Sequence, residues 1–131
     1  MGSEMCIRDR GGAPSYLYFF DWHSPVHNGR MGAYHTLEIP FIFYNLDLGA
    51  SMTGSSQQRY QLGHVMSAAW AAFARTGNPN HVDMPHWPAF DSERYQTMIF
   101  GETVRVENDP NREARLALLR INGDQLSNWR S

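Results

Sequence analysis

Residues 32–43 read GAYHTLEIPFIF, and they join a polar loop to an apolar segment. The loop before them, from Trp22 to Tyr34, contains the glycine, proline and histidine residues that are typical of turns. His35 therefore leaves a flexible loop just before side chains that would fix its backbone in a core. Taken alone, a loop histidine is more often a surface or structural residue than a catalytic one, so the flanking segments decide its interpretation.

A run of aromatic and aliphatic residues, Tyr16–Phe20, precedes this loop between Pro14 and Asp21. A continuous apolar run of this length is typical of a strand that is buried on both faces in a parallel sheet. A parallel neighbour needs a crossover connection, and nothing before residue 14 supplies one. We therefore expect the partners of this strand to lie outside the chain.

The most regular apolar pattern predicts a helix over Gln57–Thr76. Ser55 or Ser56 is expected to cap its first turn, and Gly77 followed by Pro79 ends it. The apolar residues recur at intervals of three and four, and they are Leu62, Val65, Met66, Ala69, Trp70, Phe73 and Ala74.

Shorter elements are predicted on either side of this helix. We predict a short helix over residues 37–45 and a linker of small residues over residues 49–56. Residues 96–106 are predicted to form a two-stranded hairpin. A last helix is expected to open at Asp109, where proline follows, and to turn Leu116 and Leu119 inward before ending by residue 123.

The composition is that of one globular domain, with 131 residues of which 42% are hydrophobic and 18% charged. Eleven lysines and arginines against 13 acidic residues give a net charge of -2, which provides no basic surface for nucleic acid. No apolar run approaches the roughly 20 residues that span a bilayer, so we expect no membrane partner. Cys6 is the only cysteine, which excludes an internal disulfide and a thiolate zinc site.

Residues 4–10 read EMCIRDR and resemble the translation of a sequencing-library adapter. We therefore expect residues 1–10 to be non-native and residues 11–131 to carry the domain.

Residues 32–43 resemble the catalytic-histidine motif of type B carboxylesterases, the cholinesterase-like branch of the α/β-hydrolases. In that family a Gly-x-x-His-x-x-Glu-hydrophobic pattern carries the base of the catalytic triad, and His35 falls on its histidine. Residues 66–80, which read MSAAWAAFARTGNPN, resemble the C-terminal helix of the family and its Gly-Asn-Pro-Asn end. Residues 87–90 and 97–100 resemble the segments that follow. The strand at 16–22 and the helix opening at 108–110 also match in order, so the resemblance covers nearly everything after residue 14.

The resemblance implies the α/β fold class and, within it, the C-terminal portion of an α/β-hydrolase domain. It implies that His35 is the general base, and then the general acid, of a serine carboxylic-ester hydrolase. It further implies no metal and no organic cofactor, a small carboxylic ester as the substrate of the intact enzyme, and the missing upstream part of the same domain as a partner.

Other parts of such a site have no counterpart in this sequence. The nearest approach to a Gly-x-Ser-x-Gly nucleophile elbow, GASMTG at residues 49–54, has its second glycine one residue late. No triple-glycine oxyanion segment is present, and the triad acid of the family would lie upstream. We therefore expect the fragment alone to be inactive.

Two other functions fit the same residues. One is a non-catalytic cholinesterase-like domain used for adhesion or interaction, and the other is a free-standing binding module whose strand is paired within the chain. Glu38, three residues after His35, is expected to orient the loop or cap the next segment and not to be the triad acid. The pairs His23/His27 and His81/His86 lack further ligands at zinc spacing, so we expect polar turn residues.

Overall fold

The computed structural model describes residues 13–128, and the side chains of the last helix only as far as residue 121. The segment that we expect to be non-native, residues 1–10, lies outside the described residues. The elements in chain order are β1 (Leu17–Phe20), the 3-10 helix η2 (Val26–Gly29), α1 (Ile39–Ile42), α2 (Ala50–Thr53), α3 (Gln58–Thr76), β2 (Gln96–Phe100), β3 (Arg105–Asn108) and α4 (Arg112–Asn128).

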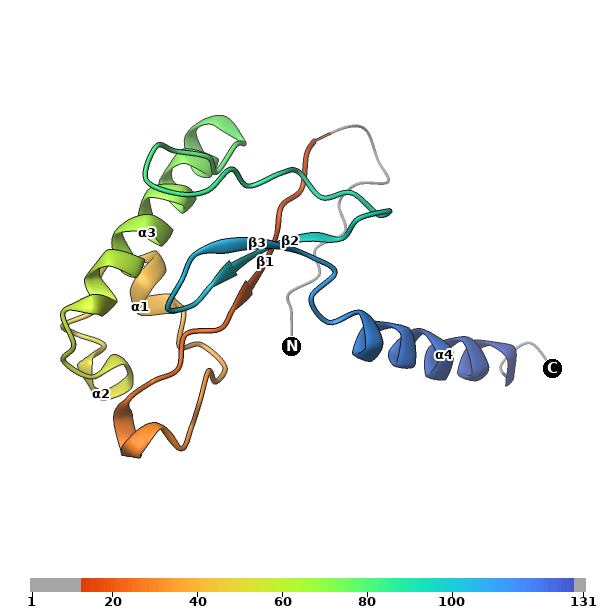
Figure 1. The fold of residues 1–131 in the computed structure, drawn as a ribbon, viewed down its shortest axis with the longest axis horizontal. Helices are drawn as coiled ribbons and strands as arrows, with labels where there is room; N and C mark the ends of the chain where they lie inside the picture. Colours follow the sequence, from red (N-terminus) through yellow and green to blue (C-terminus); the bar gives the residue numbers. More distant parts are fainter. Residues whose placement is uncertain (1–12, 129–131) are drawn as a thin grey trace.

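The described strands form one sheet in the order β1-β2-β3 (Figure 1). β1 pairs in parallel with β2, with Leu17 opposite Thr97 and Phe20 opposite Phe100. The backbone N–H of Asp21 extends this pairing by donating to the carbonyl of Phe100 at 2.7 Å. β2 and β3 form the predicted antiparallel hairpin. The expectation that the partners of β1 lie outside the chain is therefore wrong for one edge, because the crossover follows β1 instead of preceding it.

Helix α3 is the longest element of this crossover, and it lies beside the sheet together with α1 and α2 (Figure 1). Its buried residues Leu62, Met66 and Ala69 confirm the predicted apolar face. Phe73 and Ala74 depart from the prediction, because both residues are exposed near the C-terminal end of the helix.

Both ends of α3 follow local backbone chemistry. Gly77 has a φ of 74°, a left-handed conformation that glycine adopts at little cost, and its N–H donates to the carbonyl of Phe73 at 2.7 Å. The helix opens one residue later than predicted, after Gln57. Ser56 still contributes there, because its hydroxyl accepts the N–H of Gln58 at 3.3 Å.

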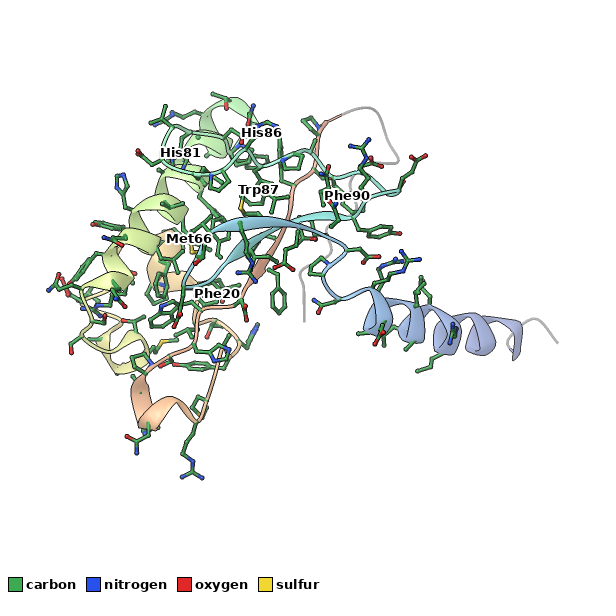
Figure 2. The ribbon with its side chains drawn as sticks, viewed as in Figure 1. Phe20, Met66, His81, His86, Trp87 and Phe90 are labelled. Atoms are coloured by element: carbon green, nitrogen blue, oxygen red, sulfur yellow. The ribbon has the colours of Figure 1, made fainter. Side chains whose placement is uncertain are left out.

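Aromatic rings fill the space between α3 and the sheet. Trp70 on α3 meets Tyr18 on β1 and Phe100 on β2, at ring-centroid distances of 5.0 and 5.8 Å. Trp87 comes from the loop after α3 (Figure 2), meets Phe100 at 5.5 Å and donates its indole N–H to the carbonyl of Leu17 at 3.1 Å. Such edge-on and tilted pairs stabilise a core beyond the area that they bury.

The segment that was expected to be a linker, residues 49–56, instead contains helix α2 and a fully buried side chain, Thr53. Its small residues are needed for close approach: a Cβ added to Gly49 would lie 2.7 Å from Cγ of Pro40. The composition that predicted a linker therefore reflects tight packing of α2 against α1. The short helix predicted over residues 37–45 is present as α1.

Helix α4 extends away from the rest of the molecule (Figure 1). Leu116 is half-buried but Leu119 is 55% exposed, so the prediction that both leucines turn inward is wrong for Leu119, and the helix continues past residue 123. The helix begins at Arg112, because Asp109 has a φ of 48° and its carboxylate accepts a hydrogen bond from Nε of Arg115 at 3.0 Å. None of the helices within residues 13–128 has the length and apolar character needed to cross a membrane.

Candidate functional site

His35 lies on a turn between η2 and α1, and its side chain is exposed. The turn is closed by the N–H of Leu37, which donates to the carbonyl of Tyr34 at 3.2 Å. Leu37 and Phe41 are fully buried, so the backbone is anchored in the core immediately after the imidazole. Between them and the histidine, Thr36 has a φ of 71°, which is strained for a β-branched residue. Strain of this kind clusters at functional sites.

The loop that leads to His35 is held against α2 from both of its ends. At the start of the loop the buried hydroxyl of Ser24 donates to the carbonyl of Met52 at 2.6 Å and accepts the N–H of Val26 at 3.2 Å. At the end of the loop the hydroxyl of Tyr34 reaches the same carbonyl at 3.5 Å. The N–H of Ser24 also donates to the carbonyl of Gly32 at 3.2 Å. The carbonyl of Met52 on α2 therefore accepts hydrogen bonds from both ends of the loop that carries His35.

Glu38 is half-buried at the start of α1, where its carbonyl accepts the N–H groups of Phe41 and Ile42, each at 3.0 Å. Its carboxylate makes no capping hydrogen bond to the helix. The carboxylate acts on β1 instead: burial raises the pKa of the Tyr18 phenol, and the negative charge of Glu38 raises that pKa further. Among the described residues no hydrogen bond or ion pair joins Glu38 to His35, so the interpretation of Glu38 as a structural residue stays a prediction.

The other loop histidines are not turn residues as predicted, because His27 lies in η2 and the others, His23, His81 and His86, lie in irregular loop segments. His81 contacts the carbonyl of Val65 through Nε2 at 3.0 Å and accepts the N–H of Asp83 at Nδ1, at 3.3 Å. These partners assign the proton to Nε2. His23 lies 3.9 Å from a carboxylate oxygen of Asp21. Within the part of the chain that the structure describes, no three histidine, cysteine, aspartate or glutamate side chains gather closely enough to hold a metal ion.

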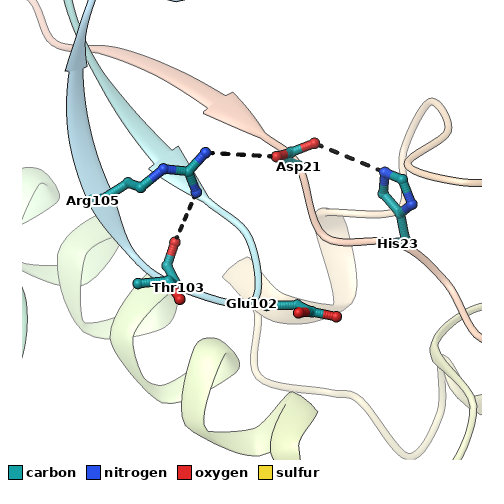
Figure 3. Close-up of a pocket in the computed structure, with 5 residues that line it drawn as sticks. All are labelled: Asp21, His23, Glu102, Thr103 and Arg105. Carbon is teal, nitrogen blue, oxygen red and sulfur yellow. Dashed lines mark hydrogen bonds and ion pairs between the residues drawn. The ribbon is translucent and has the colours of Figure 1, made fainter.

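A polar hollow of about 440 Å³ lies where β1 and β2 end (Figure 3), and sequence reasoning did not single it out. Asp21 and His23 follow β1, and Glu102, Thr103 and Arg105 come from the turn into β3. Ligands of open α/β sheets commonly bind outside the carboxyl ends of parallel strands. Arg105 lies 3.9 Å from Asp21 and donates to the carbonyl of Thr103 at 3.3 Å, and its nearest carboxylate is that of Glu107 on β3, at 2.6 Å.

Comparison with known protein families shows to which family this chain belongs. A family model described as "Carboxylesterase family" matches residues 3–117. The chain belongs to the carboxylesterase family. The matched range starts within the segment that we expect to be non-native, and that expectation stays a prediction.

Two relatives of this carboxylesterase chain show the extent of the likeness. Para-nitrobenzyl esterase of Bacillus subtilis is 39% identical over 116 residues, which are 86% of this chain and 23% of the relative. Cocaine esterase of Homo sapiens is 39% identical over 85 residues, which are 62% of this chain and 15% of the relative. The chain therefore spans about a quarter or less of the length of these relatives.

Solved structures give the same result. A thermophilic para-nitrobenzyl esterase is 40% identical, with a TM-score of 0.69 over 79% of this chain and 21% of its own. A carboxylesterase of Geobacillus stearothermophilus is 40% identical, with a TM-score of 0.68 over 81% of this chain and 22% of its own. The fold is accordingly part of an α/β-hydrolase, as predicted, and the partial sheet is the mixed sheet of that class.

Sequence reasoning missed one residue that holds this region together. Arg59 is buried, and its guanidinium contacts the segment between α1 and α3. A signal for its burial was present, because Arg59 precedes Leu62, Met66 and Ala69 at the same spacing of three and four residues. Because arginine is charged, Arg59 was not counted among the apolar residues of the helix.

Proposed function

We propose that this chain supplies His35 as the general base of a serine carboxylesterase. The observation that carries the proposal is an exposed imidazole on a turn whose backbone is anchored by Leu37 and Phe41, in a chain of the carboxylesterase family. Exposure leaves the ring open to a partner from the rest of a longer protein. Anchoring limits the ring to a small set of positions, which a base needs for in-line proton transfer.

The proposed role of His35 is proton transfer in both halves of an acyl-enzyme reaction. The imidazole takes the proton of a serine hydroxyl while the serine oxygen bonds to the ester carbonyl carbon. The same proton then goes to the alkoxide as the bond from the carbonyl carbon to the alcohol oxygen breaks. In the second half, His35 takes a proton from water and returns it to the serine.

The substrate that we propose is a small carboxylic ester. The relatives support this class, because they are described as para-nitrobenzyl esterase and cocaine esterase. The serine, the acid that orients the imidazole and the oxyanion donors would come from upstream residues of a longer protein. The chain alone is expected to lack hydrolase activity, because loss of a triad member costs several orders of magnitude in turnover.

A hybrid enzyme tests the proposal. In this hybrid esterase, the segment of para-nitrobenzyl esterase that matches this chain is replaced by the present chain from Ala13 onward. Hydrolysis of para-nitrophenyl acetate is measured with the original His35, with His35→Asn and with His27→Asn. His27 is the matched control, because it is an exposed histidine of the same loop and its φ of 56° is one that asparagine tolerates.

We expect His35→Asn to lower kcat by about a thousandfold or more and His27→Asn to leave it unchanged. A folded hybrid esterase that hydrolyses no ester, or one in which His35→Asn retains full activity, overturns the proposal and favours the non-catalytic interaction domain. Circular dichroism and the melting temperature establish folding. A smaller graft, residues 14–45 only, gives the same comparison if the complete hybrid does not fold.

A further inference from the structure

Arg59 is the most deeply buried charged side chain described, with 4% of its surface exposed. Taking a guanidinium out of water costs several kcal/mol, which hydrogen bonds from its donors offset. Among the described residues Nε of Arg59 is buried without a hydrogen-bond partner, so the two Nη atoms make all of its hydrogen bonds. Here Nη1 donates to the carbonyl of Leu46 at 2.9 Å, to the hydroxyl of Thr53 at 2.7 Å and to the carbonyl of Gly54. All of these acceptors belong to the segment 46–54, which contains α2.

The second arm of the guanidinium holds the start of the same segment. Nη2 donates to Oδ1 of Asp47 at 3.0 Å and to the hydroxyl of Tyr60 at 3.1 Å, and that hydroxyl in turn donates to Asp47. Asp47 is 78% exposed, so this ion pair lies at the surface and contributes little by itself. The buried arm carries the greater weight, because three acceptors converge on Nη1.

The segment that Arg59 fixes is the one to which the His35 loop is fastened. Thr53, which accepts from Arg59, directly follows Met52, whose carbonyl receives Ser24 and Tyr34. Tyr34 immediately precedes His35. Hydrogen bonds from Arg59 to Thr53, the peptide bond between Thr53 and Met52, and hydrogen bonds to the Met52 carbonyl thus connect the guanidinium to both ends of the loop.

Close packing against α1 and α3 limits how far the segment 46–54 can move. Gly49 lies so close to α1 that a Cβ would stand 2.7 Å from Cγ of Pro40, and a Cβ on Gly63 of α3 would stand 2.8 Å from Cδ1 of Leu46. Leu46 is itself fully buried. Close-packed elements of this kind transmit a displacement instead of absorbing it.

We infer that Arg59 is a positioning residue for His35, acting through α2 and the carbonyl of Met52. Arg59 does not touch the reacting atoms. Its fork of donors sets where α2 lies, and α2 sets where the two ends of the His35 loop lie. This inference rests on the proposed function, since His35 matters to turnover only if it is the base.

The test uses the hybrid esterase with Arg59→Lys, which keeps the charge but loses the fork of donors. A displacement of the base by about 1 Å is enough to lower turnover by about a hundredfold, so we expect kcat to fall by at least about tenfold with little change in KM. Arg75→Lys is the matched control, because Arg75 is an exposed arginine near the end of the same helix. Assays well below the melting temperature separate this effect from loss of folded protein.

A double-mutant cycle identifies the route of coupling. Ser24→Ala removes the hydrogen bond to Met52 without touching Arg59, and it is a milder change should Arg59→Lys fail to fold. If both residues act on the same loop, the kcat of the double variant will be close to that of the more damaged single variant. Losses in kcat that multiply independently overturn the inference.

Hydrogen exchange gives a readout that does not depend on activity. In Arg59→Lys we expect faster exchange of the backbone amides at residues 30–38, and in Arg75→Lys none. Unchanged kcat in folded Arg59→Lys, or faster exchange confined to α3 and residues 46–54, overturns the inference while leaving the role of His35 intact. Full activity of His35→Asn instead overturns the proposed function, and the exchange data then still report whether Arg59 positions the loop.

Discussion

The indole N–H of Trp87 donates to the backbone carbonyl of Leu17 at 3.1 Å, across 70 residues of chain. This bond fastens the loop after α3 to β1, the strand from which the His35 loop departs. Trp87 is 3% exposed, and its ring also meets Trp70 at a centroid distance of 6.1 Å. A single side chain therefore links the beginning and the end of the crossover.

Trp87→Phe keeps an aromatic ring and removes the donor to Leu17. We expect the free energy of unfolding of the hybrid esterase to fall by about 1 kcal/mol from the lost hydrogen bond, plus the loss from a smaller ring. Urea unfolding measures this fall in the free energy of unfolding. Trp70→Phe is the control, because among the described residues the Trp70 indole makes no hydrogen bond while its ring lies in the same cluster. Equal losses in the two variants would show that the bond to Leu17 contributes nothing.

Gly49→Ala tests the close approach of α2 to α1. The backbone of Gly49 has a φ of -88°, which alanine adopts freely, so the effect is steric. A Cβ 2.7 Å from the rigid Pro40 ring forces the helices apart, and we expect a loss of about 1–3 kcal/mol.

Gly63→Ala is the comparison for Gly49→Ala, since its Cβ would meet side-chain atoms only, Cδ1 of Leu46 at 2.8 Å and the ring of Tyr44 at 3.3 Å. Alanine also gains up to about 1 kcal/mol of helix propensity over glycine at this position. We expect a smaller loss than for Gly49→Ala in the same urea unfolding measurement. A loss as large at Gly63 would mean that Leu46 cannot move.

The attachment of α4 is expected to weaken in acid. Hydrogen bonding to Arg115 holds the pKa of Asp109 below its usual range. A carboxyl group whose pKa is lowered by folding stabilises the structure above its unfolded pKa, about 3.9, and that contribution is lost as pH falls through the folded value. The protection of the amides at residues 112–116, corrected for the pH dependence of exchange in an unfolded chain, should therefore fall below about pH 4. In Asp109→Asn, which suits the φ of 48°, exchange should be fast already at neutral pH and should lack this step.

Glu38→Gln should lower the pKa of Tyr18. Burial is the larger cause of the raised pKa and remains in the variant, so only the part due to the Glu38 charge should disappear. An NMR titration of the Tyr18 ring measures the change. A pKa that does not move would place the Glu38 carboxylate away from β1.

Local patterns predicted the elements well, and long-range pairing poorly. The helix ending at Gly77 and the hairpin at residues 96–106 depend on neighbours in sequence, which periodicity and turn residues reveal. The pairing of Leu17 with Thr97 does not depend on neighbours in sequence, because no residue of β1 indicates which later strand will pair with it. Leu119 was assigned to a core from its spacing alone, although more than half of its surface is exposed.

The candidate site was predicted in part. The position of His35 on an anchored turn follows from the order of polar and apolar residues around it. The hydrogen bonds that support this turn do not follow from the sequence, because Ser24 and Met52 are brought together only by the placement of α2. Arg59 was overlooked since a charged residue on an apolar helical face is more often solvated than buried, and only the carbonyls that converge on it justify its burial.

The parallel pairing of β1 with β2 also fixes the order of events during synthesis. Residues 17–35 leave the ribosome well before Thr97 and Phe100, with which β1 pairs. The rate at which such distant contacts form is limited by the closure of a long loop. β1, the strand that leads into the His35 loop, therefore gains its parallel partner only when β2 has been made, so a ribosome-bound chain ending before residue 96 is expected to leave this edge of β1 unpaired.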